Sequence, residues 1–288
     1  METTDLLKRV RQIEIKTRGL SKNIFAGEYH SAFKGRGMTF SEVREYQYGD
    51  DIRNIDWNVT ARFNNPYIKI FEEERELTVM LLVDVSGSRE FGSMTQLKKN
   101  MITEMAATLA FSAIQNNDKI GIIFFSDRVE KFIPPKKGRS HVLHIIRELI
   151  NFYPEHRSTN ISDVLRYQTN ALKKRCTTFV ISDFMDDNFE DAMMIASKKH
   201  DMVGIQVYDK REAELPDAGL LKLVDAETGQ DLWVDSSKRS VRVQYSENWR
   251  KRQAEVNRVF TKCGVDNVSI RTDEDYVKGL MKLFKQRG

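Results

Sequence analysis

Residues 77–88 read L-T-V-M-L-L-V-D-V-S-G-S, an apolar run that ends in one carboxylate and two hydroxyls. The near-continuous apolar run predicts a strand over 77–83 that is buried on both faces, as strands of a parallel sheet are. Asp84, Ser86 and Ser88 then fall on the loop that leaves the carboxyl end of this strand. These side chains offer only oxygen, which suits Mg²⁺ or Mn²⁺ better than a soft metal. The stretch therefore predicts a buried strand of an α/β sheet with a hard-metal site at its end.

Beyond this stretch the chain alternates between strand-like and helix-like patterns. Further apolar runs predict strands at 120–125, 178–182, 202–208 and 267–270, and helices fit at 94–116, 139–151, 161–174, 188–199, 245–262 and 273–286. Strands that alternate with helices form a doubly wound, mostly parallel sheet with helices on both faces. Such α/β sheets bind ligands outside the carboxyl ends of their strands, where Asp84 is expected to lie.

Four segments fall outside this alternation. Apolar residues at helical spacing predict an amphipathic helix over about residues 4–18. Short aromatic pieces broken by turn sequences at 35–74 predict a small β-rich subdomain. An edge strand is expected at 129–133, before Pro134-Pro135, and a hairpin over 220–235 that turns around Thr228-Gly229. The expected organisation is an N-terminal helix and linker at 1–34, the β-rich subdomain at 35–76 and the α/β domain at 77–288.

Composition limits the possible functions. The chain has 288 residues, 40% of them hydrophobic, so it can bury a substantial core. Its 46 basic and 42 acidic side chains give a net charge of only +4, which argues against a nucleic-acid binder; residues 1–37 hold a local basic excess that suits a solvated helix face. Cys176 and Cys263 stand in no metal-binding spacing, which predicts core positions in a reducing cytoplasm. No run approaches the roughly 20 apolar residues that span a bilayer, so no membrane span is expected.

Two more oxygen-bearing residues fit a metal site with the first three. A divalent ion needs ligands from more than one loop to complete its coordination. Asp183 directly follows the predicted strand at 178–182, and Thr159 stands just before a predicted helix. If the strands that end at Asp84 and Asp183 are neighbours, their loops and the Thr159 loop converge on one crevice.

This set of five residues resembles the metal-ion-dependent adhesion site of von Willebrand factor A domains, D-x-S-x-S followed by Thr and Asp. The resemblance covers about residues 77–288 and implies a bound Mg²⁺ or Mn²⁺. It implies the hydroxyls of Ser86, Ser88 and Thr159 as direct ligands, with Asp84 and Asp183 binding the ion directly or through water. Members of that family often carry Gly after the last Asp, whereas Phe184 stands here, which puts the shape of the third loop in question.

A second resemblance covers the block before the α/β domain. Residues 35–62, G-R-G-M-T-F-S-E-V-R-E-Y-Q-Y-G-D-D-I-R-N-I-D-W-N-V-T-A-R, and 68–76, I-K-I-F-E-E-E-R-E, are very similar to the bacterial family numbered fifty-eight among domains of unknown function. Members are often encoded beside MoxR-type AAA+ ATPases, which implies such an ATPase or its client as partner. From the residues alone, the acids of 48–62 suit either a second acidic site or, as we expect, Arg–carboxylate pairs beside a packed Trp57 that fix the subdomain against the sheet.

Other interpretations of the Asp84 loop remain. D-x-S-x-S also suits an ordinary helix cap. Ser86 lacks the glycine of a G-x-S-x-G nucleophile elbow, since Asp84 occupies that position, and none of the five histidines is an evident base, although His156 lies three residues before Thr159. We therefore expect no enzyme but a metal-dependent protein-binding adaptor in the assembly or maturation of other proteins. Its Mg²⁺ or Mn²⁺ would accept a Glu or Asp carboxylate from the partner. The alternative is a metal-dependent hydrolase acting on phosphate esters.

Overall fold

In the computed structural model the described residues are 11–14, 39–72, 77–92, 97–225 and 229–287. Backbone contacts divide the chain into two compact units, Lys34–Leu77 and a larger unit that contains Thr78–Gly288. Residues 11–14 are helical, in agreement with the N-terminal helix predicted over residues 4–18, whose other residues lie outside the described ones.

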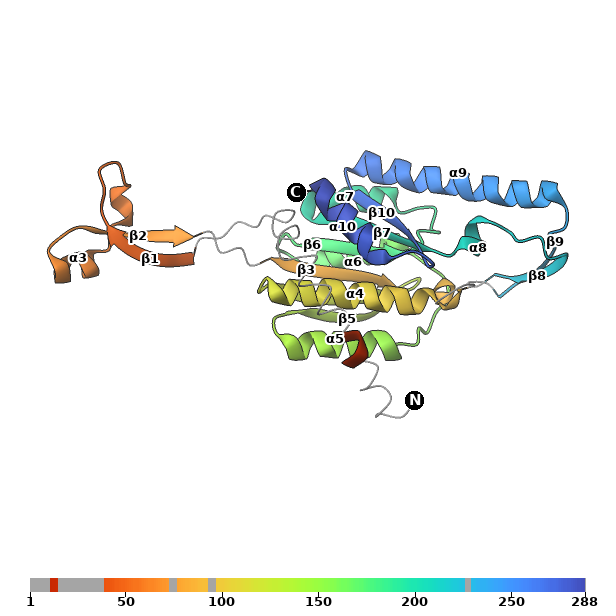
Figure 1. The fold of residues 1–288 in the computed structure, drawn as a ribbon, viewed down its shortest axis with the longest axis horizontal. Coiled ribbons are helices and arrows are strands. Elements are labelled where there is room, and N and C mark those ends of the chain that lie inside the picture. The colour runs from red at the N-terminus through yellow and green to blue at the C-terminus, as the bar shows by residue number, and fades with distance from the viewer. Residues whose placement is uncertain (1–10, 15–38, 73–76, 93–96, 226–228, 288) are drawn as a thin grey trace. The chain divides into compact units, whose positions relative to one another are not determined.

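The larger unit is built on a six-stranded sheet with the order β10-β7-β6-β3-β4-β5 (Figure 1). Its strands are β3 (Thr78–Asp84), β4 (Lys119–Phe125), β5 (Val129–Lys136), β6 (Thr177–Ser182), β7 (Asp201–Tyr208) and β10 (Asp266–Arg271). All neighbouring strands are parallel except β4 and β5, which are antiparallel. The doubly wound, mostly parallel sheet predicted from the sequence is confirmed.

Helices cover both faces of this sheet. They are η2 (Gly87–Glu90), α4 (Lys98–Gln115), α5 (Arg139–Asn151), α6 (Ile161–Ala171), α7 (Glu190–Lys199), α8 (Lys210–Ala213), α9 (Arg239–Cys263) and α10 (Tyr276–Arg287). The six predicted helices are present, but α9 begins six residues before the predicted start because its first turns are polar and show no apolar period. Helix α4 begins at Lys98 and not at the predicted residue 94, because the backbone of Leu97 is extended. No helix in the described ranges combines the length and apolar character needed to cross a membrane.

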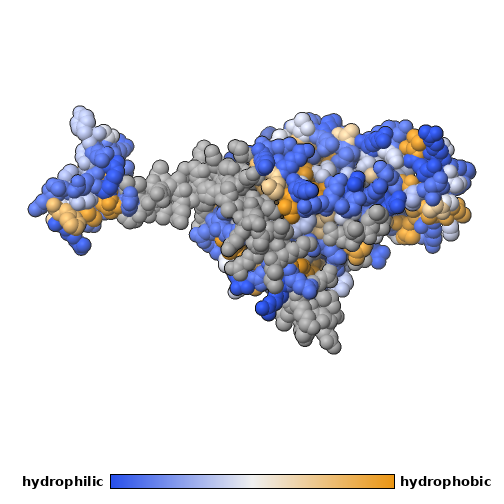
Figure 2. Space-filling model, viewed as in Figure 1, coloured by the Kyte–Doolittle hydropathy of each residue, from blue (hydrophilic) through white to orange (hydrophobic). Residues whose placement is uncertain are grey.

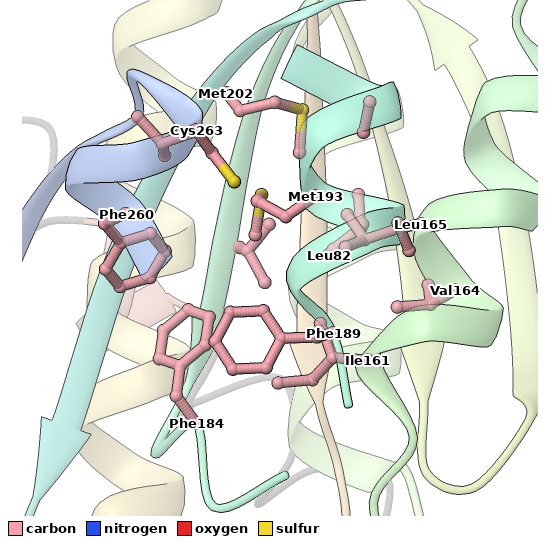
Figure 3. Packing of buried hydrophobic residues seen from close by; sticks show 14 of the residues in the cluster. Leu82, Ile161, Val164, Leu165, Phe184, Phe189, Met193, Met202, Phe260 and Cys263 are labelled. Atoms are coloured by element: carbon pink, nitrogen blue, oxygen red, sulfur yellow. The ribbon is translucent and has the colours of Figure 1, made fainter. Parts of the chain in front are cut away.

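The core lies on the two sides of β3 and β6. Met80 and Leu82 belong to a cluster with apolar residues of α6, α7 and α9, part of which Figure 3 shows. On the opposite face of the sheet, Phe179 of β6 packs edge-on against Phe284 of α10, with ring centroids 6.3 Å apart. Cys176 and Cys263 are buried and carry free thiols, so their predicted core positions are confirmed. Alternate residues of these strands thus face two separate helical layers.

The edge strand β5 runs three residues further than predicted, through Pro134-Pro135 to Lys136. Its pairing with β4 shifts register between Ile120 and Ile122, on either side of Gly121. A Cβ at Gly121 would lie 2.8 Å from the backbone nitrogen of Pro135 and 2.9 Å from the carbonyl oxygen of Ile133. The glycine therefore allows the close backbone approach that keeps the two prolines in the strand.

The predicted hairpin over 220–235 is confirmed as a separate two-stranded sheet. β8 (Leu220–Val224) pairs antiparallel with β9 (Asp231–Asp235), and Gly229 adopts a left-handed backbone with φ of 70°. Thr228, the other predicted turn residue, lies outside the described residues. Leu220, Leu232 and Trp233 are each more than 60% exposed, and apolar surface is visible at the hairpin end of the larger unit in Figure 2.

The smaller unit consists of an antiparallel pair, β1 (Thr39–Glu45) and β2 (Tyr67–Glu72), joined through η1 (Ile52–Asn54) and α3 (Trp57–Phe63). Strands and turns were expected here, and α3 was not. Asp56 caps this helix by accepting hydrogen bonds from the backbone N–H groups of Asn58 and Val59, and the helix ends at Asn64 in the left-handed conformation. Seven residues are too few to show a helical apolar period, which is why the sequence pattern missed it.

The acidic block of this unit forms one Arg–carboxylate pair, with an arginine outside the block, and two helix caps. Asp50 forms a two-pronged pair with Arg44, at 2.8 Å for each bond, instead of pairing with an arginine inside the block. Asp51 and Asp56 serve as caps of η1 and α3. Trp57 is 71% exposed and opens a helix that buries no residue, so it is not packed within its own unit, and its expected packing against the sheet stays a prediction. The acids of the block thus fix local turns.

Candidate metal centre

The residues of the candidate centre come from the carboxyl ends of two neighbouring strands. β3 pairs with β6, and the chain reaches Asp84 and Asp183 where these strands end. The next strand along the chain, β4, pairs with one edge of β3, and β6 later pairs with the other edge of β3. The order of strands reverses between β3 and β6, and this is the position at which a doubly wound sheet opens a crevice for a ligand.

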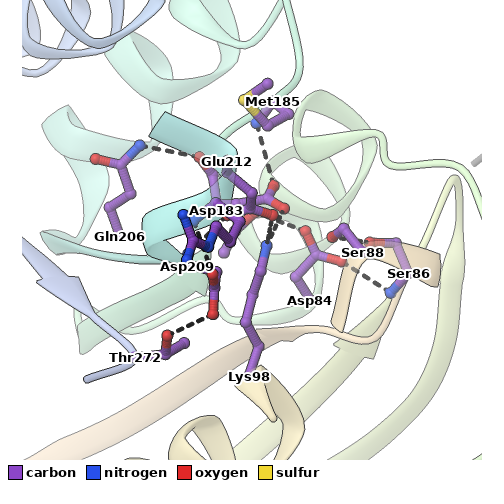
Figure 4. A network of polar contacts seen from close by, with 12 residues as sticks. Asp84, Ser86, Ser88, Lys98, Asp183, Met185, Gln206, Asp209, Glu212 and Thr272 are labelled. Atoms are coloured by element: carbon purple, nitrogen blue, oxygen red, sulfur yellow. Dashed lines mark hydrogen bonds and ion pairs between the residues drawn. The ribbon is translucent and has the colours of Figure 1, made fainter. Parts of the chain in front are cut away.

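Asp84 is buried and organises its own loop (Figure 4). Its Oδ1 accepts a hydrogen bond from the backbone N–H of Ser86 at 2.9 Å, and its Oδ2 accepts one from the hydroxyl of Ser182 at 2.6 Å. The hydroxyl oxygens of Ser86 and Ser88 lie 3.2 Å apart. The loop therefore turns back on the carboxylate and brings two hydroxyls together beside it.

Asp183 is also buried and joins the same group. The Ser88 hydroxyl is hydrogen-bonded to its carboxylate, and its Oδ1 accepts from the backbone N–H of Met185 at 3.3 Å. Its Oδ2 lies 3.0 Å from Nζ of Lys98, the first residue of α4. The structure thus brings together four of the five predicted residues, Asp84, Ser86, Ser88 and Asp183, and adds a lysine.

The two buried carboxylates have opposite pKa shifts. Burial, followed by the negative charge of Asp183, raises the pKa of Asp84 to about 6. Burial alone would also raise the pKa of Asp183, but the Lys98 ammonium and the Ser88 hydrogen bond outweigh it and hold that pKa below its usual value. The Lys98 ammonium therefore balances the charge of Asp183, whereas no such cation balances Asp84 among the described residues. A cation bound beside Asp84 would reduce the repulsion between the two carboxylates.

Thr159, the fifth predicted residue, is held near the group by its backbone. In the loop that carries Thr159, the carbonyl of Arg157 accepts a hydrogen bond from the N–H of Gly87 at 2.9 Å. In the same loop, the N–H of Asn160 donates to the carbonyl of Ser126 at 2.9 Å. The Thr159 hydroxyl is buried and has no hydrogen-bond partner among the described residues. It therefore forms no hydrogen bond with the other four side chains. A buried hydroxyl without a partner lowers the stability of the fold by about 1–3 kcal/mol. A bound cation would supply the missing partner.

The donor set suits a hard divalent cation. Two carboxylates and three hydroxyls are available, and neither imidazole nor thiolate belongs to the group. Across the described ranges, no three His, Cys, Asp or Glu side chains gather closely enough to hold a metal by themselves. An ion at this position would depend on the hydroxyls of Ser86, Ser88 and Thr159 as much as on the carboxylates, which fits Mg²⁺ or Mn²⁺.

Phe184 shapes the third loop of the centre. Its φ of 56° lies in the left-handed region that glycine favours and that an aromatic residue rarely adopts. The ring is buried and packs against Phe189 and Phe260, with centroids 5.7 and 5.0 Å away. Core packing thus holds a backbone conformation that is unfavourable for this residue. The chain therefore forms the turn after Asp183 with a phenylalanine in a backbone conformation that favours glycine.

Sequence reasoning missed two charged residues of the centre, Lys98 and Glu212. Lys98 Nζ lies 2.5 Å from Oε1 of Glu212 on α8. A lysine in the first turn of a predicted helix looks like a solvated residue, so no signal marked Lys98. Glu212 belongs to the capping box that begins at Asp209, and the D-K-R-E spacing at 209–212 is a signal for that box alone.

The four described histidines, His141, His144, His156 and His200, have polar partners other than the five predicted residues. His156 Nδ1 is 3.5 Å from Oδ2 of Asp127, and His141 Nε2 is 2.9 Å from the carbonyl oxygen of Ile120. His200 contacts the thiol of Cys176, and His144 is paired only loosely with Glu148. In the described part of the chain, none of these four contacts the candidate ligands. Among the residues that the structure describes, Ser86 has no imidazole as a hydrogen-bonded base, and His30 lies outside them.

Comparison with protein families gives a match over most of the chain. The model of the family described as "Protein of unknown function DUF58" matches residues 42–255, well over half of the chain. An uncharacterized protein of Mycobacterium tuberculosis (strain ATCC 25618 / H37Rv) is 28% identical over 289 residues, which cover 98% of this chain and 90% of that protein. The uncharacterized protein YeaD of Bacillus subtilis (strain 168) is 27% identical over 109 residues, 38% of this chain and 25% of that protein.

Solved structures give weaker likenesses. The hypothetical protein BatB from Bacteroides thetaiotaomicron is 15% identical with a TM-score of 0.49, over 73% of this chain and 98% of that chain. The SpRpn10 VWA domain is 12% identical with a TM-score of 0.39, over 73% of this chain and 95% of that chain. With TM-scores below 0.5, neither likeness assigns a function to this chain.

Proposed function

We propose a function for this chain on the premise that it belongs to the DUF58 family of proteins of unknown function. It acts as a non-enzymatic adaptor that binds a protein partner through a divalent cation, Mg²⁺ or Mn²⁺. The residues that would hold the ion are Asp84, Ser86, Ser88, Thr159 and Asp183. The observation that carries the proposal is the buried, unpartnered hydroxyl of Thr159, on a loop bonded to the loop that presents Asp84 and the two serines.

The neutral hydroxyls decide what such a centre does. When bound, the cation supplies an electrophile that accepts an oxygen ligand from outside the chain. Ser86, Ser88 and Thr159 contribute no negative charge, and Asp183 is already paired with Lys98. The chain therefore leaves the cation short of negative charge, and a partner's Glu or Asp carboxylate is the ligand that supplies it.

The family resemblance supplies the class of partner. A MoxR-type AAA+ ATPase, or a client of that ATPase, is the protein that we propose to bring the carboxylate, and the role is in the assembly or maturation of other proteins. A metal-dependent hydrolase of phosphate esters would need a base beside the ion. No imidazole among the described residues forms a hydrogen bond or ion pair with the five side chains, so the base of such a hydrolase would have to be a carboxylate.

Partner capture tests the proposal. The full chain, immobilised in Mg²⁺, is expected to retain a partner from extracts of its own cells, and EDTA should release it. Asp84→Asn keeps a side chain that accepts hydrogen bonds but removes a charge, so it should lose the partner while the thermal unfolding curve stays cooperative. Asp127→Ala, which changes a carboxylate outside the set of five, is the matched control and should retain it. Mass spectrometry of the released proteins identifies the ATPase or client.

Two outcomes of this experiment would contradict the proposal. Capture that survives both EDTA and Asp84→Asn would exclude the metal-bridged adaptor. Metal-dependent turnover on a panel of phosphate esters, abolished by Asp84→Asn, would favour the hydrolase instead.

A further inference from the structure

Exposed apolar side chains stand on each of the three loops that carry the candidate ligands. The first loop, between β3 and α4, carries Phe91 and Leu97; the second, between α5 and α6, carries Tyr153; and the third, between β6 and α7, carries Met185. These four residues, which we call the apolar rim, are between 41% and 74% exposed. A single exposed apolar residue is ordinary, but several that gather at one end of a sheet form a patch, and such patches mark binding surfaces.

Backbone contacts of the first loop hold its two rim residues beside the centre. Phe91 follows η2, and its N–H donates to the carbonyl of Ser88 at 3.2 Å. The N–H of Lys98 in turn donates to the carbonyl of Phe91 at 3.1 Å. Leu97 directly precedes Lys98, so both rim residues of this loop adjoin residues of the centre.

The rim residues of the other two loops are tied to the same place. The carbonyl of Phe152 accepts a hydrogen bond from Nη2 of Arg89 at 2.8 Å, which joins the second loop to η2. The ring of the neighbouring Tyr153 lies under Nζ of Lys99, 4.8 Å from the ring centroid. Met185 donates its backbone N–H, at 3.3 Å, to the carboxylate that follows β6 (Figure 4). The rim therefore borders the centre on all three loops.

The exposed charges near the rim carry both signs. Glu155 and Arg157 of the second loop are both exposed, and Asp187 of the third loop pairs with Arg252. A partner segment with a run of acids would gain little from these mixed charges. The apolar rim, rather than surface charge, is thus the feature that distinguishes one acidic segment from another.

We propose that the apolar rim receives a protein segment in which a Glu or Asp is flanked by large apolar side chains. The inference rests on the proposed function, in which that carboxylate binds the cation. A segment that reaches the centre must contact the rim, because the rim residues come from all three loops. Water competes for an exposed metal–carboxylate contact and screens it, and an apolar cover that excludes water strengthens it. The rim therefore adds affinity and selects the neighbours of the carboxylate.

Selection from a peptide library tests the proposal. The full chain, immobilised in Mg²⁺, is exposed to phage that display random short peptides, and the bound phage are eluted with EDTA. We expect the eluted peptides to share a Glu or Asp with a large apolar residue next to it or one residue further away. Eluted peptides that share an acid but show no enrichment of apolar neighbours would overturn the proposal.

Two rim variants measure the contribution of the rim with one selected peptide. Leu97→Ser and Tyr153→Ser should each weaken binding of the synthetic peptide about tenfold in fluorescence anisotropy, because a large apolar contact is lost. Their Mn²⁺ affinity, measured by electron paramagnetic resonance, should equal that of wild type, since neither residue is a proposed ligand.

Structural damage does not explain such a result. Leu97 is the N-cap of α4 and makes no side-chain hydrogen bond there, whereas serine is a favoured N-cap, so Leu97→Ser should fold at least as stably as wild type. Ile195→Ser, at an exposed apolar residue on the outer surface of α7, is the matched control and should bind the peptide as wild type does.

Failure of this inference is distinct from failure of the proposed function. If both rim variants bind the selected peptide as tightly as wild type, the role of the rim is overturned and binding through the metal stands. If EDTA elutes no peptide although wild type binds Mn²⁺, the inference is again overturned, and partner capture still decides the proposed function. If wild type does not bind Mn²⁺, both are wrong.

Discussion

Thr159 allows the metal proposal to be examined at one atom. Its buried hydroxyl has no partner among the described residues, so Thr159→Val removes no hydrogen bond and nearly preserves the shape. We expect the free energy of unfolding to stay within about 0.5 kcal/mol of wild type, or to rise slightly, because no polar partner is left unsatisfied. The affinity for Mn²⁺ should fall by at least about tenfold, because a ligand is lost.

Urea unfolding and Mn²⁺ titration measure the two effects separately. Thr169→Val is the matched control: its hydroxyl donates to the Leu165 carbonyl at 2.7 Å within α6, so it should lose a little stability and no Mn²⁺ affinity. Unchanged Mn²⁺ affinity in Thr159→Val would remove Thr159 from the ligand set.

His200 is a second residue with a measurable consequence. Its side chain is buried at the end of α7, and its Nδ1 lies 3.2 Å from the sulfur of Cys176. Burial, followed by the positive charges of Lys199 and Arg175, lowers the pKa of His200 to about 4. An unfolded chain holds the same imidazole in water, where its pKa is about 6.5. The folded protein therefore keeps His200 neutral over a range in which the unfolded chain is protonated.

This difference predicts acid destabilisation. Between about pH 6.5 and pH 4 the unfolded state binds more protons, so the free energy of unfolding falls as the pH falls, by about 2 kcal/mol from this histidine. Above about pH 6.5 the effect of His200 disappears. Urea unfolding at several pH values measures it, and His200→Gln should reduce the pH dependence in this window. His144→Gln, at a half-exposed histidine of α5, should keep the wild-type dependence, and equal slopes in all three proteins would contradict the assignment.

At the scale of elements, the contact between β7 and α9 determines how closely the long helix approaches the sheet. A Cβ at Gly204 would lie 2.6 Å from Cζ of Phe260, closer than side chains pack. Phe260 also contacts Phe184, and Arg252 of the same helix forms an ion pair with Asp187. Helix α9 therefore supports the loop that follows Asp183. Its close packing on β7 depends on glycine at position 204, which has no side chain.

Gly204→Ala is expected to destabilise the protein by about 1–3 kcal/mol, because the added methyl group overpacks the contact with the Phe260 ring. Phe260→Leu makes room for it, so the double variant should be less destabilised than the sum of the two single variants. Urea unfolding of the four proteins gives the coupling energy directly. Strict additivity, or a Gly204→Ala protein as stable as wild type, would contradict this account of the contact.

The elements that could be predicted are those whose burial leaves a pattern. The strands over 77–83 and 178–182 were found because both faces are covered, which makes the sequence continuously apolar. The first turns of α9 were missed since they are largely exposed, and α3 was missed because seven residues carry too little periodicity. The extension of β5 through Pro134-Pro135 could not be foreseen, because it depends on Gly121 of the neighbouring strand.

At the scale of the whole molecule, the candidate centre shows where sequence reasoning stops. Asp84 and Asp183 could be placed together, since both follow strands and carboxyl ends of parallel strands share one edge. Lys98 and Glu212 could not, because each comes from an element whose local pattern has another explanation. Pairing them with Asp183 requires the packed order of α4, β6 and α8.

The edge strand β5 has a consequence for the protein in concentrated solution. Of two successive residues in a strand, one N–H faces the neighbouring strand and the other faces outward, so Pro134-Pro135 removes a donor on both sides. A strand from a second molecule would find the outer side of β5 short of a hydrogen bond, with Lys131 and Lys136 along the same strand. The sheet is thereby protected, on this side, against the strand-by-strand growth that leads to fibrils.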